Sequence, residues 1–185
     1  MTKKQKTMEH NPIQTMLDEH EVICQTEGII ENLDKNWEAD AEQYKTTVAT
    51  LITFFREYAD GYHHRKEEEV LFPAINDHPD FVLQEMIEEF ETHHEDFRSY
   101  TSLIEMALEE GDYEKAQKGL NNYIQDLLDH IAAENDELFV LAETLMDEDE
   151  LETIYFKFKD IDLELGEDRK VELEESIKNC KKYLK

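Results

Sequence analysis

Hydrophobic residues recur every three or four positions through most of the chain, which is the spacing of amphipathic helices. Four long segments with this spacing are separated by short interruptions that contain Gly, Pro or Asn-Asp. Asn11 and Pro12 open the first segment as a helix cap and a first helical residue, and Asp112 can cap the fourth. The segments cover about residues 12–35, 48–75, 78–111 and 112–141.

Short connections force neighbouring long helices to run antiparallel. The chain is therefore predicted to be all-α, with an up-down-up-down four-helix bundle over residues 10–146. Residues 147–185 are richer in charge and contain two shorter helical patterns on either side of Gly166, from Leu151 to Leu165 and from Val171 to Leu184. We expect these additional C-terminal helices to pack on the outside of the bundle.

The charge of the chain excludes several classes of partner. Its 185 residues include 47 acidic and 19 basic side chains, a formal net charge of -28. Such a polyanion repels nucleic acid and anionic lipid, so neither is expected as a partner. Cys24 and Cys180 are too few and too far apart for a disulfide framework. The first residues are not followed by an apolar run, and no stretch is long and apolar enough to span a membrane, so we expect no signal peptide and a cytoplasmic protein.

The second and fourth segments contain the same arrangement of polar residues. Glu67 follows His63 by four residues, Glu134 follows His130 by four, and a Leu-Phe pair comes eight and nine residues after each histidine. The first and third segments also align when one histidine of each is set against the other. The sequence is therefore typical of two similar helical hairpins. The candidate metal ligands are His20, His63, Glu67, His94, His130 and Glu134.

This spacing suits a metal site in the middle of a bundle. Residues four apart on a helix share one face, about 6 Å apart along the axis, so a His and a Glu can reach one centre. Glu134 shares its helical stripe with Leu127, Ile131 and Leu138, and a buried carboxylate is costly unless something compensates its charge. Imidazole and carboxylate ligands without a thiolate suit iron, manganese or zinc. We therefore predict a pair of metal ions of one of these kinds.

The same residues also have simpler interpretations. His20 and His94 could be core or boundary histidines, and the two His–Glu pairs could stabilise solvated helix faces. A frame shifted by one residue, His64 with Glu68, is an alternative register on the second segment. The alignment with the fourth segment favours His63, so His64 is placed outside the site.

Several neighbours of the candidate ligands are assigned supporting or structural roles. His93 is a candidate extra ligand, although a residue in this position more often supports a ligand or lies at the surface. Arg65 and Lys66 could tune the charge of the site, although long cations at the rim of a helix are usually solvated. Tyr58 and Tyr62 could hydrogen-bond a bound oxygen ligand, but core packing is the simpler prediction.

A family resemblance rests on these same motifs. They are Glu19-His20, residues 59–68 followed by Leu71-Phe72-Pro73, His94 with Arg98, and His130 with Glu134. Over about residues 10–146 the chain resembles the hemerythrin-like family, the HHE cation-binding domain. The resemblance implies an up-down bundle with a non-haem di-iron centre. It also implies that Glu67 and Glu134 bridge the irons while the four histidines are terminal ligands.

The chain departs from the family pattern in two places. In the second copy of the motif, Asn135 replaces the second Glu and Val140 replaces the Pro, so the surroundings of the centre differ while its ligands remain. The oxygen-carrying hemerythrins place two histidines one turn apart on helix three, whereas the positions four from His94 are Phe90 and Arg98 here. The resemblance therefore does not extend to the oxygen carriers' ligand set.

The leading hypothesis is a di-iron protein that binds, senses or detoxifies a small molecule such as O2, NO or peroxide. A metal storage or buffering protein is the alternative, because an acidic surface draws cations inward. A helical interaction module with incidental histidines is a third hypothesis. The sequence contains no Gly-rich phosphate loop and no nucleophile motif. A protein partner or a homodimer is left open.

Overall fold

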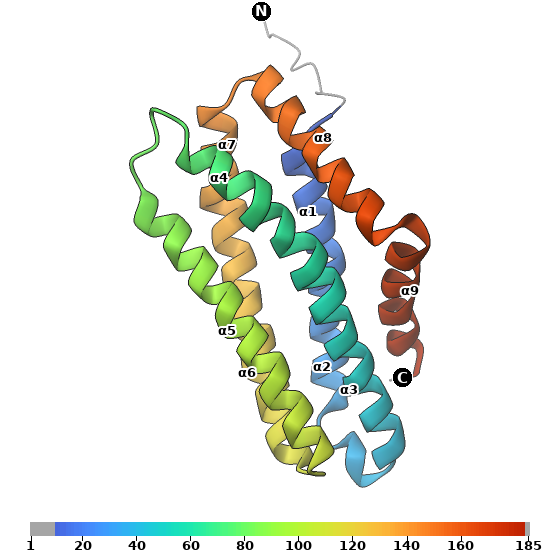
Figure 1. The fold of residues 1–185 in the computed structure, drawn as a ribbon. Helices are drawn as coiled ribbons and strands as arrows, with labels where there is room; N and C mark the ends of the chain where they lie inside the picture. Colours follow the sequence, from blue (N-terminus) through green and yellow to red (C-terminus); the bar gives the residue numbers. More distant parts are fainter. Residues whose placement is uncertain (1–9, 184–185) are drawn as a thin grey trace, which may run out of the picture.

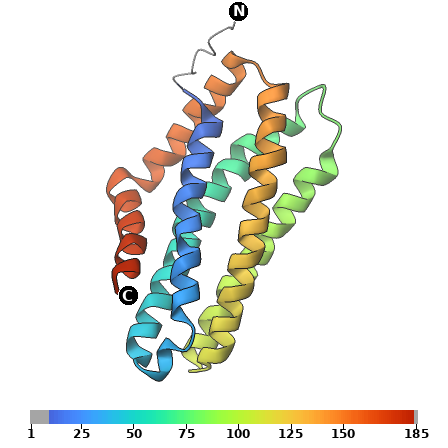
Figure 2. The same ribbon diagram turned by 180° about the vertical axis from the view of Figure 1, so that it is seen from behind.

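The computed structural model describes residues 10–183, which form helices and turns but no strand. Four long helical rods run alternately up and down around a common core, and a helical hairpin follows them (Figure 1). The view from behind shows the same alternation, with the first and last rods in front (Figure 2). The predicted all-α, up-down-up-down bundle with additional C-terminal helices is confirmed.

Each rod is a helix or a run of helices joined end to end. The first is α1 (Pro12–Ile23), η1 (Cys24–Thr26) and α2 (Glu27–Leu33), and η2 (Asn36–Glu38) leads to the second. The second is α3 (Ala41–Phe54), η3 (Phe55–His64), η4 (Glu67–Leu71) and α4 (Phe72–Asn76). The third is α5 (Gln84–Glu109), and the fourth is α6 (Tyr113–Ala133), η5 (Glu134–Leu138) and α7 (Phe139–Leu145).

The rods begin and end at the residues that local chemistry favours. The Asn11 side chain accepts hydrogen bonds from the backbone N–H groups of Ile13 and Gln14, and the Asp112 side chain accepts one from Lys115. Gly111, with a φ of 73°, makes the turn between α5 and α6. The predicted helix caps at Asn11 and Asp112 are therefore confirmed.

The third rod begins later than the sequence suggested. Its helix starts at Gln84, whereas the prediction opened it at His78. The N–H of Phe81 donates to the carbonyl of His78 at 3.0 Å, which closes a tight turn with Pro79 as its second residue. Proline at that position favours a turn as much as a helix start. Phe81 is buried all the same, so this loop still covers the end of the core.

Three segments of the rods have the wider π-helical turn. They are η3 and η4 in the second rod and η5 in the fourth. A π-helix bonds each N–H to the carbonyl five residues back, and short stretches of it often occur at functional sites. Here they lie at His63, Glu67 and Glu134, three of the candidate ligands.

The C-terminal hairpin consists of α8 (Glu148–Leu165) and α9 (Glu167–Tyr183). A capping box between Asp147 and Glu150 starts α8. α8 lies on α1, η3 and η4, while α9 lies on α2 and α3 (Figure 1). Leu184, the predicted end of the last helix, lies outside the described residues. The division into domains 10–146 and 147–185 stays a prediction.

The bundle interior is apolar and rich in aromatic rings outside the site. Tyr44, Phe54, Phe55 and Tyr123 are fully buried in it, and Phe158 brings α8 into the same core. None of the helices in residues 10–183 has the length and hydrophobicity that crossing a lipid bilayer requires.

Candidate metal centre

The six predicted ligands come from all four rods and lie together inside the bundle. Each is at most 2% exposed. Two histidine pairs face each other across two carboxylates: the first pair is His20 with His63, and the second pair is His94 with His130. The residues and their elements are His20 on α1, His63 on η3, Glu67 on η4, His94 on α5, His130 on α6 and Glu134 on η5.

Glu67 lies between the two histidine pairs. Its Oε1 is 3.7 Å from Nε2 of His63, and its Oε2 is 3.5 Å from Nε2 of His94. η4 begins at Glu67 with the wider π-helical turn, and the carboxylate lies buried on the inner face of the second rod. One oxygen therefore faces each pair.

Glu134 mirrors this arrangement from the fourth rod. Its Oε2 is 3.2 Å from Nε2 of His20, and its Oε1 is 3.0 Å from Nε2 of His130. The same Oε1 is 3.9 Å from Nε2 of His94. The two carboxylates thus present four oxygens to the space between the histidine pairs.

None of these four oxygens accepts a hydrogen bond from a described residue. Both carboxylates are fully buried, and a buried charged oxygen without a donor is strongly unfavourable in a folded protein. Cations between the histidine pairs would compensate the charge. The donor set therefore fits a pair of metal ions.

The first pair is prepared to act as metal ligands. Nδ1 of His63 donates to Oε2 of Glu19 at 2.9 Å, and Nδ1 of His20 donates to Oδ1 of Asn135 at 2.8 Å. In a neutral imidazole the other nitrogen is then an acceptor. The two Nε2 atoms lie 2.8 Å apart, so two lone pairs converge where no hydrogen bond can join them. Such outer hydrogen bonds fix the tautomer of histidine ligands in metal sites.

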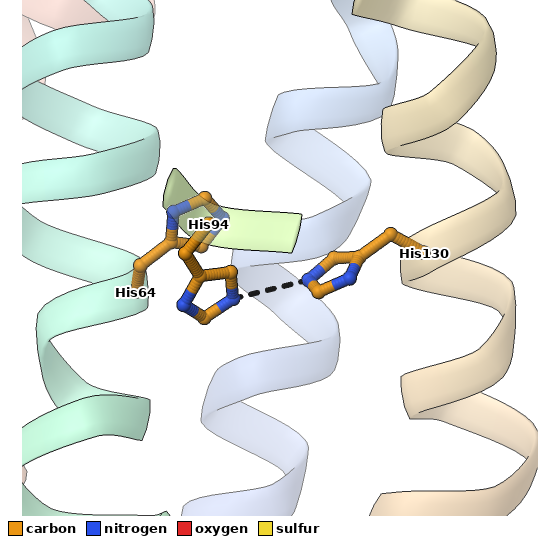
Figure 3. A group of neighbouring side chains, drawn as sticks. All are labelled: His64, His94 and His130. Atoms are coloured by element: carbon orange, nitrogen blue, oxygen red, sulfur yellow. Dashed lines mark hydrogen bonds between the residues drawn. The ribbon is translucent and has the colours of Figure 1, made fainter. Parts of the chain in front are cut away.

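The second pair has a similar outer shell of polar contacts. Nδ1 of His94 donates to Oε1 of Glu68 at 2.8 Å, and Nδ1 of His130 lies 3.2 Å from Nδ1 of His93. The Nε2 atoms of His94 and His130 lie 3.1 Å apart, close enough to share a proton or an ion (Figure 3). His93 thus contacts a predicted ligand from outside the centre.

The electrostatics of the two carboxylates differ. Burial, and then the charge of Glu134, hold the pKa of Glu67 well above its ordinary value. Burial also raises the pKa of Glu134, but the histidines around it, His130 first, lower the pKa well below its ordinary value. One neutral and one ionised carboxyl is the arrangement that protein groups alone favour. Two bound cations would favour ionisation of both.

Lys66 is buried, contrary to the prediction that long cations beside the site are solvated. It is 0% exposed, and its Nζ donates to Glu19 at 2.5 Å and to Asp162 of α8 at 2.7 Å. The Tyr62 ring lies 3.8 Å from the ammonium, and the Tyr62 hydroxyl also donates to Asp162. The C-terminal hairpin covers this face of the bundle. Glu19 therefore connects a candidate ligand, His63, to α8 through Lys66.

His64 was placed outside the site, yet it lies beside the second pair. It is 2% exposed, and its ring groups with His94 and His130 so that one nitrogen of each lies within 4.8 Å of the others (Figure 3). On an ideal α-helix, neighbouring residues point far apart. The wider π-helical turn of η3 lets His63 and His64 both face the interior. Nothing in the apolar spacing marks this change of helix type.

The fold and the site define a helical-bundle protein with a buried histidine–carboxylate centre suited to cations. Residues 6–142 match the family model of the hemerythrin HHE cation binding domain, and the chain belongs to this family. The match ends before α8, so the C-terminal hairpin lies beyond the family domain. No curated protein and no solved structure gives a significant match.

Proposed function

We propose that the chain holds two metal ions, iron by first choice, and that the centre binds, senses or detoxifies a small molecule such as O2, NO or peroxide. His20 and His63 would bind one ion, and His94 and His130 the other. Glu67 and Glu134 would bridge the two ions, and each carboxylate would give one oxygen to each ion. Manganese or zinc suits the same donors.

One observation carries this proposal. Four buried carboxylate oxygens accept no hydrogen bond from the described residues, and they lie between two pairs of histidine nitrogens that converge at 2.8 and 3.1 Å. Ordinary core polar groups find hydrogen-bond partners. Imidazole nitrogens and carboxylate oxygens that converge on one buried space are the arrangement expected for metal ligands.

Each ion would receive two nitrogens and two oxygens from the protein. Iron with nitrogen and oxygen ligands commonly takes more donors than this, and sites with open positions are those that activate oxygen compounds. When bound, iron would supply the redox chemistry. In neutral rings, donation from Nδ1 to Glu19, Glu68 and Asn135 leaves Nε2 of each histidine facing the ions.

Elemental analysis and optical spectroscopy test this proposal together. We expect about two irons per chain after anaerobic loading with iron(II), and a new near-ultraviolet or visible band when O2, NO or hydrogen peroxide is added. Failure to retain any metal after reconstitution would overturn the ligand assignment. Two bound irons without an optical response to any of the three would overturn the proposed reaction and leave the metal site standing.

Metal storage or buffering is a second candidate, and one observation favours it. A cleft of 330 Å³ reaches His130 from the surface, and Asp96, Asp126 and Asp129 line it with His93. Carboxylates along such a path attract cations. Exchange of bound iron with an external chelator within minutes, without an optical response to oxygen, would support this function over the first.

A further inference from the structure

A second cleft, of 260 Å³, lies between η3, α5 and α6 and ends on His64. Phe55, Phe97 and Tyr123 form aromatic walls, and the exposed Ser102 stands at its rim. Pockets for drug-sized ligands span about 300 to 1,000 Å³, so this cleft suits something smaller.

His64 separates the cleft from the second histidine pair. Its ring stacks on the ring of His94, with centroids 3.8 Å apart and planes 7° from parallel. Lone pairs of imidazole nitrogens lie in the ring plane, and a metal–nitrogen bond is about 2.0 to 2.1 Å. Two nearly parallel planes at this separation cannot both contain one ion. His64 in this position is therefore a wall residue beside the ligand His94, although their nitrogens are close.

Two polar groups of the cleft make no hydrogen bond to a described residue. Nδ1 of His64 is buried, and its nearest charged neighbour is Oδ1 of Asp60 at 3.5 Å, beyond good hydrogen-bond distance. The hydroxyl of Tyr123 likewise bonds to no residue in the described part of the chain, and burial raises the pKa of Tyr123 well above its ordinary value, which keeps that hydroxyl protonated. Unpaired polar groups in a confined space bind a ligand that can hydrogen-bond to them.

The polar wall of the cleft is continuous with the outer contacts of the centre. Arg98 donates to Asp60 at 2.8 Å and to Glu68 at 2.7 Å, and Glu68 is the acceptor that holds His94. The hydroxyl of Thr101 is already committed to the carbonyl of Arg98. A molecule in the cleft would therefore find a cation fixed in the wall, the unbonded hydroxyl of Tyr123, and Nδ1 of His64 beside Asp60.

We infer that this cleft is the entry and binding pocket for the small molecule, and that it takes an oxygen or nitrogen compound of two or three heavy atoms that accepts hydrogen bonds. His64 and Tyr123 position the molecule beside the second histidine pair. The inference rests on the proposed function and names the route by which the ligand reaches that centre.

Sodium azide is the probe, because the azide ion has three heavy atoms and accepts hydrogen bonds. Ser102→Trp closes the rim from an exposed helix position, and Leu103→Trp places the same ring one residue further on, at a side chain that is 56% exposed and outside the cleft. With iron-loaded, oxidised protein, we expect Ser102→Trp to slow azide association at least about tenfold. Leu103→Trp should leave the rate within about twofold. Equal rates in the two variants would overturn the inference.

Two further measurements separate this inference from the proposed function. Tyr123→Phe removes a single hydroxyl, so we expect azide affinity to fall about fivefold to tenfold, the effect of one hydrogen bond; unchanged affinity would overturn the positioning role. In the metal-free protein, azide should shift the nuclear magnetic resonance signals of the His64 ring and the Thr101 methyl group, and no shift there would overturn the pocket. If the iron-loaded protein gives no optical response to any of the ligands, the proposed function fails. The azide titration of the metal-free protein would still show whether the cleft binds a small molecule.

Discussion

Glu67 is the side chain whose replacement separates metal binding from folding most cleanly. Glu67→Gln keeps the shape but removes a charge and one bridging donor, so we expect metal content to fall from about two ions per chain to one or none. Its raised pKa already favours the neutral carboxyl, so the metal-free variant should differ from the parent by less than about 1 kcal/mol in the free energy of unfolding. Elemental analysis and urea denaturation measure the two effects.

A matched control for this substitution lies two residues along the same rod. Glu69 is exposed and accepts a hydrogen bond from Arg65 at 3.0 Å. Glu69→Gln should retain the full metal content and the parent stability. Full metal content in Glu67→Gln would contradict the bridging role.

The histidines of the centre predict how the metal-free protein responds to acid. His63, His64 and His130 have pKa values lowered first of all by burial, so they stay neutral in the folded protein but bind protons in the unfolded chain below 6.5. The pKa of His94 is raised, so this ring is protonated in both states there, and Glu67 holds one extra proton when folded. The unfolded chain therefore binds three protons at these histidines that the folded chain does not, while the folded chain binds one at Glu67. The net difference of two protons favours unfolding in acid. Stability should therefore fall with acid by at most about 2.7 kcal/mol per pH unit, the effect of two protons.

Urea denaturation at pH 7, 6 and 5 measures this dependence. Stability is expected to be greatest above 6.5 and to be lost as the pH falls below it. His64→Gln should reduce the slope by about one proton, or roughly 1.4 kcal/mol per pH unit. Stability that rises with acid would contradict the prediction.

The sequence identified most of the buried polar residues, but not all of them. The repeated His-x-x-x-Glu spacing and the apolar stripe predicted that the six candidate ligands lie together, and they do so in the fold. His64 was missed because its burial depends on a local change of helix type. Lys66 was missed because its second partner, Asp162, lies about a hundred residues away on a helix without a recognisable motif.

The contact between α8 and the bundle depends on the buried Lys66. Lys66→Met keeps most of the volume but leaves the carboxylates of Glu19 and Asp162 without their cation. Removing one partner of a buried ion pair costs about 3 to 5 kcal/mol, and we expect a loss of this size in the free energy of unfolding. Faster hydrogen exchange of backbone amides along α8 should accompany it.

A control for this substitution involves the same acceptor. Lys159 also donates to Asp162, at 2.7 Å, but its side chain is 46% exposed. Exposed ion pairs contribute at most about 1 kcal/mol, so Lys159→Met should have a small effect on stability and on exchange. Equal effects of the two substitutions would contradict a special role for the buried lysine.

The four rods could be predicted, whereas several details within them could not. Regular apolar spacing and the caps at Asn11 and Asp112 define long helices. The loop before Gln84 depends on whether Pro79 starts a helix or a turn, and both are compatible with its fixed φ. The position of the C-terminal hairpin depends on polar contacts such as the hydrogen bond from Arg169 to Glu57, which apolar periodicity does not reveal.

Metal binding should stabilise the folded chain as a unit. A ligand at a hundredfold excess over its Kd adds about 2.7 kcal/mol. For a chain of this size each kcal/mol raises the Tm by about 2 to 4 °C, so iron loading should raise it by roughly 5 to 10 °C. Calorimetry with and without a chelator measures the shift, and Glu67→Gln should show a smaller shift than the parent protein. An unchanged Tm in the parent protein would favour the interaction module with incidental histidines.

Glu19 has one carboxylate oxygen on the His63 ring and the other on the Lys66 ammonium, which also binds α8. Occupancy of the first histidine pair and seating of α8 are therefore two equilibria that share one carboxylate. Thermodynamic linkage requires the coupling to be reciprocal: the factor by which metal tightens α8 equals the factor by which α8 tightens metal. A molecule that captures the C-terminal hairpin would then adjust the affinity of the centre without touching it.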